Sequence, residues 1–134
     1  MCRGKSVKHL ATGLLWLIIA ATPVAAQSAY AKFDSKGRTI GLYNLLADTT
    51  GCQPSQIFSG VIGKVTYDVR QPVYTYTFVL NAKPKRVTLN LIANDDEILQ
   101  PDVEDIILKN ARVRVRARQC GSGAIWSAEE VRRL

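Results

Sequence analysis

One pattern in this chain has the spacing of a chemical site: four arginines occupy alternate positions near its C-terminal end. They are Arg112, Arg114, Arg116 and Arg118, and they alternate with Val113, Val115 and Ala117. In a β-strand, alternate side chains share one face at steps of roughly 7 Å. A row of guanidinium groups at that spacing attracts phosphate, an anionic polymer or an acidic protein.

Two other interpretations of the row stay open at this point. The row is tolerated as a solvated face, because unit charges ~7 Å apart in water repel by only about 0.6 kcal/mol. Internal pairing is the third interpretation, because six acids lie between Asp95 and Asp105. They are Asp95, Asp96, Glu97, Asp102, Glu104 and Asp105.

The remaining residue types argue against catalysis. The single histidine is His9, near the start of the chain, so residues 27–134 have no imidazole for Ser/His/Asp or Cys/His chemistry. Asp95, Asp96 and Glu97 lack the spacing of a calcium loop, and nothing in the sequence fixes two carboxylates at a glycosidase separation. We therefore expect no enzyme activity, no cofactor and no metal.

The first 26 residues have the pattern of a cleaved signal peptide. Arg3, Lys5 and Lys8 precede an apolar run of roughly a dozen residues, which is short of the ~20 that cross a bilayer. Val24-Ala25-Ala26 supplies the small residues of a cleavage site. Removing this leader takes away three of the 18 basic residues and none of the 11 acidic ones, which leaves a net charge of +4. The pattern predicts export to the periplasm or the extracellular space, with no membrane span afterwards.

Two cysteines remain once the leader is removed. Cys52 and Cys120 are each other's sole partner within residues 27–134, and an oxidising compartment favours their pairing. On the chain-entropy model, a bridge that closes the long loop from Cys52 to Cys120 stabilises the fold by roughly 4 kcal/mol.

Hydrophobic periodicity predicts one mostly β domain after a lead-in segment. The lead-in has a turn at Ser35-Lys36-Gly37 and the spacing of a short helix over 39–47. The expected strands cover residues 60–69, 73–80, 86–92, 111–119 and 124–132, with one short amphipathic helix between Asn94 and Asn110.

Alternation assigns a face to each side chain of the first three strands. We expect the inward side chains to be Val61, Gly63, Val65, Tyr67 and Val69; then Tyr74, Tyr76, Phe78 and Leu80; then Val87, Leu89 and Leu91. Gly63 inside the first strand is typical of a bulge or a sharp bend. The outward side chains are rich in threonine and are expected to be solvated or to bind a saccharide.

The order of elements resembles a five-stranded oligonucleotide/oligosaccharide-binding (OB) barrel, with three strands, a helix and two strands in residues 59–134. The local features are Val61-Ile-Gly63-Lys-Val65, Tyr76-Thr-Phe78-Val-Leu80, and Ala111-Arg-Val113-Arg-Val115 leading through a glycine turn into Ile125-Trp126-Ser-Ala-Glu-Glu-Val131. The chain is similar in this respect to small exported bacterial OB proteins. The resemblance implies a Greek-key barrel with one helix between its third and fourth strands. Residues 27–58 depart from a minimal barrel, and we expect them to form an extension packed on it.

An OB barrel hosts many functions, so the expected function is broad. We predict a non-enzymatic, exported binding module of the cell envelope that takes an anionic ligand or an acidic protein. The candidate surface is the arginine row, together with Lys83, Lys85 and Arg86 of the turn after the second strand. A single-stranded nucleic-acid or other polyanion binder is one alternative, and a secreted glycan-binding subunit of toxin type is another.

Overall fold

The computed structural model describes residues 28–83 and 85–134. The predicted leader, residues 1–26, lies outside them. Within these residues, seven strands and one short helix follow one another, so the prediction of a mostly β protein with one short helix is confirmed for the described part of the chain. The elements are β1 (Tyr30–Phe33), β2 (Thr39–Tyr43), β3 (Gln56–Arg70), β4 (Val73–Ala82), β5 (Val87–Asn94), α2 (Gln100–Ile106), β6 (Arg112–Arg118) and β7 (Trp126–Arg133).

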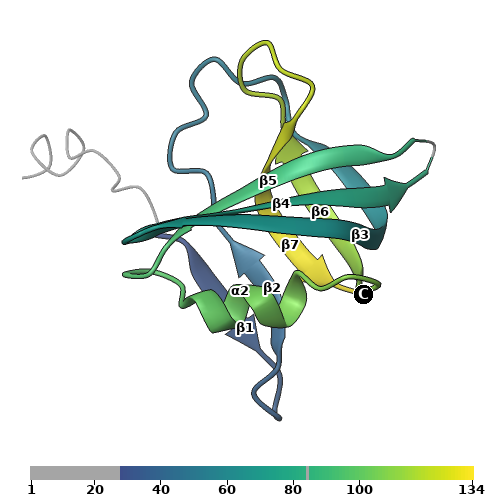
Figure 1. Ribbon diagram of the computed structural model, residues 1–134. Helices are drawn as coiled ribbons and strands as arrows, with labels where there is room; N and C mark the ends of the chain where they lie inside the picture. Colours follow the sequence, from purple (N-terminus) through teal and green to yellow (C-terminus); the bar gives the residue numbers. More distant parts are fainter. Residues whose placement is uncertain (1–27, 84) are drawn as a thin grey trace, which may run out of the picture.

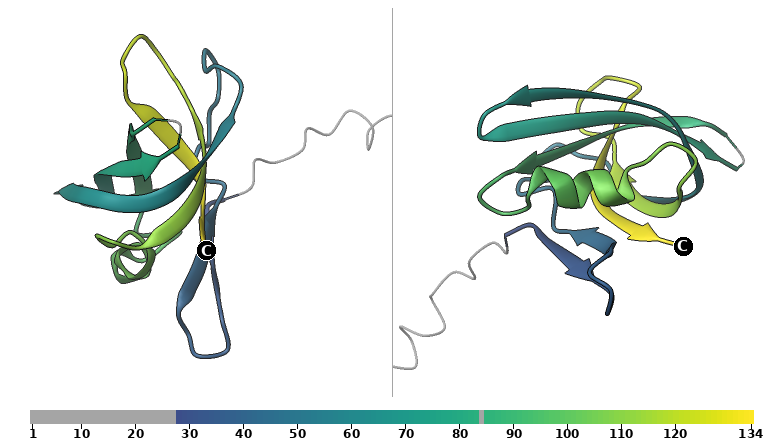
Figure 2. Two further views of the ribbon diagram at one scale, coloured as in Figure 1. Left: turned by 90° about the vertical axis from the view of Figure 1, so that its right-hand side faces the viewer. Right: turned by 60° about the horizontal axis from the view of Figure 1, so that its bottom comes forward.

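Five of the strands form a ring. The sheet order is β1-β2-β7-β5-β4-β3-β6, and a further pairing of β7 with β6 closes the last five strands on themselves (Figure 1). The β5–β7 pairing is parallel, and every other pairing in the ring is antiparallel. β2 pairs with β7 through Gly41↔Arg132 and Leu42↔Val131, so the β1–β2 hairpin continues the sheet outside the ring (Figure 2).

β3 bends so that its two halves serve different neighbours. Residues 56–61 pair with β6, and residues 65–70 pair with β4 alone, after a register shift between Ile62 and Val65. This shift is the bulge that Gly63 predicts. After the bulge the predicted face is kept, because Val65 opposes buried Phe78 and Tyr67 opposes buried Tyr76. The expected burial is nevertheless wrong for Tyr67 and Val69, which are 65% and 37% exposed in the part of β3 that pairs with β4 alone. Before the bulge the predicted face is wrong, because Ile62 is buried and Val61 is not. One extra residue in a strand inverts every side chain that precedes it.

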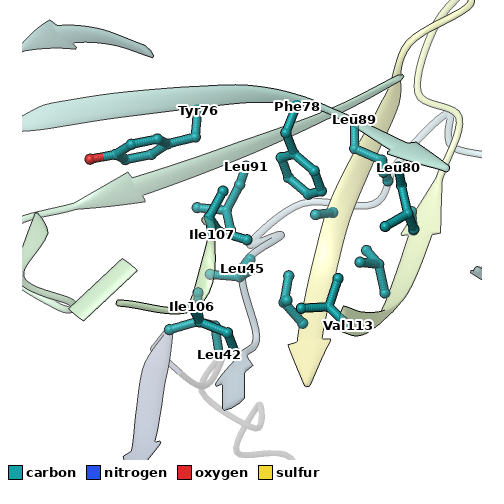
Figure 3. Close-up of a cluster of buried hydrophobic side chains, with 14 of the residues drawn as sticks. Leu42, Leu45, Tyr76, Phe78, Leu80, Leu89, Leu91, Ile106, Ile107 and Val113 are labelled. Atoms are coloured by element: carbon teal, nitrogen blue, oxygen red, sulfur yellow. The ribbon is translucent and has the colours of Figure 1, made fainter. Parts of the chain in front are cut away.

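The core lies inside the ring and is closed on one side by α2. Tyr74, Tyr76, Phe78 and Leu80 of β4 are at most 2% exposed, which confirms that the aromatic face of this strand points inward. Figure 3 shows Phe78 and Leu89 facing Ile106 and Leu42 across this core. Pro101 stands in the first turn of α2, where its missing N–H costs no hydrogen bond.

The predicted helix over 39–47 is wrong. Residues 39–43 form β2, with Thr39 and Leu42 buried. Alternation decides in favour of the strand because Leu42 faces the core beside Val131, whereas Tyr43 faces outward beside Tyr30 of β1. The five residues are stabilised as a strand by pairing with β1 and β7. A helix of this length without a capping residue has no comparable support.

The predicted disulfide is present. The sulfur atoms of Cys52 and Cys120 lie 2.05 Å apart, and the backbones of the two residues form an isolated antiparallel bridge. Gln53 N–H also donates to the carbonyl of Gln119 at 2.8 Å. The bridge therefore joins the loop before β3 to the loop between β6 and β7.

Candidate functional site

The arginine row lies on β6 with its side chains outside the ring. Val113, Val115 and Ala117 are fully buried, and the alternating Arg112, Arg114 and Arg116 are exposed. A strand with one face in the core has no other register available, so the buried valines fix the arginines outward.

The fourth arginine of the row differs from the other three. Arg118 is partly buried, and its Nε lies 3.1 Å from Oε2 of Glu129 on β7. Among the described residues, the guanidinium groups of Arg112, Arg114 and Arg116 have no hydrogen bond or ion pair. Internal neutralisation of the row by the acids between residues 95 and 105 is therefore wrong for these three.

A further arginine that the sequence pattern did not single out joins this surface. Arg132 of β7 is exposed and lies directly opposite Arg114 across the β6–β7 pairing. The inward neighbours Val115 and Val131 oppose each other with no exposure, which places the two arginines on the same outer side. Like charges directly opposite each other on adjacent strands destabilise a sheet by about 0.2–1 kcal/mol.

The row continues across β2 into β1. Arg132 opposes Gly41 of β2, and Gly41 in turn opposes Lys32 of β1. Arg114, Arg132, Gly41 and Lys32 thus stand in register on four neighbouring strands. Figure 1 shows β6, β7, β2 and β1 side by side in this order.

Tyr43 holds the β1 end of this row in place. A Cβ on Gly41 would lie 2.6 Å from the Tyr43 hydroxyl and 2.7 Å from its ring, so the ring covers the glycine. Lys32 Nζ lies 5.0 Å from the centre of the same ring, within the range of a cation–π contact. The Tyr30 ring stacks on Tyr43 with centroids 5.1 Å apart. The cation–π contact with Tyr43 therefore gives the lysine ammonium a defined position.

We call Arg112, Arg114, Arg116, Arg132 and Lys32 together the basic face. Its acidic neighbour is Glu130, which opposes Arg116 on β7 without an ion pair between them.

The three predicted site residues of the turn after β4 lie apart from this row. Lys83, Lys85 and Arg86 are exposed on the β4–β5 loop. Ala82, just before the loop, opposes Gly60 of β3, and Gly60 opposes Val113 of β6. The loop thus begins two strands away from the arginine row, at about 10 Å.

Three of the six acids between residues 95 and 105 serve the fold instead. Asp105 Oδ2 accepts the N–H of Thr39 at 2.6 Å, Glu104 accepts the hydroxyl of Tyr76 at 2.6 Å, and Glu97 accepts the N–H of Ala29 at 2.8 Å. We call this set of contacts the acidic network. Burial first, and the Glu104 contact second, raise the pKa of Tyr76 well above its usual value. The carboxylates therefore hold β1, β2 and β4 to the α2 side of the ring.

The outward face of β4 and β5 is polar and bonded to itself. Thr77 donates its hydroxyl to the Asn90 side chain at 2.7 Å, and Thr66 on β3 contacts the Thr77 carbonyl at 3.5 Å. These groups satisfy one another across three strands, and a saccharide would have to replace those bonds.

A depression of about 170 Å³ lies at the surface of the described part of the chain. It lies between the segment before β1, the segment after β2 and the paired ends of β4 and β5, and its lining includes Leu45, Val73, Ile92 and Glu97. No residue of the basic face borders it. Within residues 28–83 and 85–134, no group of three His, Cys, Asp or Glu side chains is placed to hold a metal ion, and no helix is long and apolar enough to cross a bilayer.

No protein-family model matches the chain, and no curated protein or solved structure matches it.

Proposed function

We propose that this protein is a non-enzymatic, exported binding module that takes an anionic ligand or an acidic partner on its basic face. The observation that carries the proposal is the like-charge pair of Arg114 and Arg132, directly opposite each other on adjacent strands without an internal partner. Such a pair costs the sheet stability, and an anion bound over it removes that cost.

The fold supports a binding role through its likeness to an OB barrel. The ring order β7-β5-β4-β3-β6 and the position of α2 between the third and fourth ring strands are those expected for that fold. We propose the OB-like barrel as its architecture, with the β1–β2 segment as an extension packed on it. The basic face lies on β6, β7 and that extension, so the extension belongs to the binding surface.

Export and the lack of enzyme activity are part of the same proposal. The Cys52–Cys120 disulfide is compatible with an oxidising compartment, and the first 26 residues have the pattern of a leader. Two of the carboxylates available for acid–base catalysis, Glu104 and Asp105, are instead bonded to Tyr76 and Thr39.

The test is binding of long-chain polyphosphate, a soluble polyanion, as a function of salt. We expect Arg114→Ala/Arg116→Ala to weaken binding at least tenfold and to flatten its salt dependence, because each lost phosphate contact reduces the slope. The matched control is Lys85→Ala/Arg86→Ala, which removes the same charge from the β4–β5 loop. Equal loss in both double variants would show that binding follows net charge and would contradict the proposal.

Recovery of the protein from its own compartment identifies the natural ligand. Molecules that co-purify with the wild type and are lost from Arg114→Ala/Arg116→Ala are the candidates. A co-purifying oligonucleotide would favour the nucleic-acid alternative within this proposal.

A further inference from the structure

We infer that the basic face docks on the surface of an anionic lipid bilayer. This inference rests on the proposed function and names the partner of the same surface. Four observations carry it: the extent of the face, the apolar side chains at its two ends, the position of the 170 Å³ depression away from its cations, and the occupied faces of the Tyr43 ring.

The face is wide and has apolar ends. From β3 to β1 it crosses five neighbouring strands, which is about 19 Å at the usual strand spacing. Ile57 of β3 opposes Arg116 and is 59% exposed, on the outer side because Phe58 is buried. Tyr30 of β1, at the other end, is 40% exposed. The arginines thus occupy the middle of the face, Ile57 stands at its β3 end, and Tyr30 stands with Lys32 at its β1 end.

A small anion does not match this surface. Small-molecule sites are concave and enclose most of their ligand. The depression of about 170 Å³ in the described part of the chain lies elsewhere and is lined by none of the five cations. The extent of the face instead favours a partner that presents its charges over an extended surface.

The apolar ends favour a bilayer over a soluble polyanion. A polyanion in water gains nothing from an exposed isoleucine. At a bilayer surface, tyrosine lies at the headgroup level, apolar side chains reach the acyl boundary, and lysine and arginine bind the anionic headgroups. Ile57 and Tyr30 flank the arginines in this arrangement.

The Tyr43 ring within the basic face is not placed for stacking a nucleobase. Binders of single strands expose ring faces on which bases stack. One face of Tyr43 covers Gly41, and Lys32 and Tyr30 contact the ring as well. Tyr43 supports a cation here and has no open ring face for a base.

The experiment is co-sedimentation with vesicles of phosphatidylcholine containing 30 mol% phosphatidylglycerol, compared with pure phosphatidylcholine vesicles, at about 50 mM and about 300 mM salt. All proteins come from one expression host, so that they share one N-terminus. We expect the wild type to bind the anionic vesicles at low salt and to be released at high salt. Arg114→Glu removes two units of charge and should weaken this binding on the order of 25-fold. Arg70→Glu, the same change on an arginine at the β3–β4 turn, should leave it unchanged within twofold.

A second variant separates a bilayer from a soluble polyanion. Ile57→Ser should weaken vesicle binding about fivefold and leave polyphosphate binding unchanged, because only the bilayer contacts the isoleucine. Thermal unfolding checks that each variant is folded.

Three results would overturn the inference: equal binding to both vesicle types, equal loss in Arg70→Glu and Arg114→Glu, or vesicle binding that is unaffected by Ile57→Ser. Binding of polyphosphate or of oligo(dT) through Arg114, without binding to vesicles, would also overturn it while the proposed function stands. Failure to bind any of these anions would overturn both.

Discussion

Two arginines next to each other in the chain have opposite environments. Arg133 points toward the α2 side, where its guanidinium donates to the carbonyls of Thr39 at 3.0 Å and Asp105 at 2.9 Å. Arg132 points outward, opposite Arg114, with no partner among the described residues. Arg133 thus joins the acidic network through Asp105, whereas its neighbour Arg132 belongs to the basic face.

The difference separates charges that hold the fold from charges that are free to bind. In the acidic network, donors and acceptors of β2, α2 and β7 satisfy one another, so removing one leaves another unpaired. On the basic face, the three exposed guanidinium groups of β6 have no internal bond to lose. Substitutions in the network should therefore cost stability and leave binding unchanged, and substitutions on the face should do the reverse.

We expect the largest loss of stability from a substitution in the core-facing side of α2, the helix that carries Glu104 and Asp105 of the acidic network. Ile106 is fully buried in α2 and faces the ring core (Figure 3). Ile106→Ala removes three carbons from this core and should lower the free energy of unfolding by about 3 kcal/mol. Urea unfolding measures the loss. A change below about 1 kcal/mol would mean that α2 contributes little to the fold.

Arg133→Ala should cost about 2 kcal/mol. The substitution leaves the Thr39 and Asp105 carbonyls without their charged donor and removes a cation 3.8 Å from the Asp105 carboxylate. Polyphosphate binding should not change, because Arg133 lies outside the basic face. A loss of binding with unchanged stability would abolish the distinction between the two arginines.

High pH should destabilise the fold through two buried tyrosines. Burial raises the pKa of Tyr74 and of Tyr76 well above the ordinary value of 10.0, and their hydroxyls donate to Ile98 and Glu104. The folded protein keeps these protons at a pH where the unfolded chain releases them. Stability is therefore fully present below pH 10 and falls above it, by up to about 1.4 kcal/mol per pH unit for each tyrosine. Urea unfolding between about pH 8 and about pH 11 measures the slope, and Tyr76→Phe should flatten it.

The smallest change in stability should come from the basic face. Arg132→Ala should alter the free energy of unfolding by less than about 0.5 kcal/mol, with a slight gain because repulsion from Arg114 is relieved. Polyphosphate binding should nevertheless weaken several-fold. A stability loss like that of Arg133→Ala would show that Arg132 has an internal partner.

The alternation of apolar and polar residues along the strands accounts for most of the correct predictions. Val113, Val115 and Ala117 alternate with arginines, and this two-residue period placed both the core and the charged row correctly. The aromatic residues of β4 were placed inward for the same reason. Where one extra residue interrupts the period, as it does between Ile62 and Val65, the assignment fails for the preceding half of the strand.

The full extent of the basic face could not be predicted. Arg132 and Lys32 join the arginine row through pairings between strands that are distant in the chain, and one residue of slip would remove them from it. Nothing local in the sequence encodes that register. Gly41 is the one local signal: a glycine inside the predicted helix over 39–47 weakens that helix, and in the structure it leaves the space into which Tyr43 folds its ring.

The Cys52–Cys120 bridge has a consequence for proteolysis. The covalent loop that it closes contains β3, β4, β5, α2 and β6, and the exposed β4–β5 turn lies within this loop. A protease that cuts this turn once releases no fragment, because both products stay joined through the cystine. The clipped protein keeps its mass, apart from one added water, until a reductant separates it into two chains.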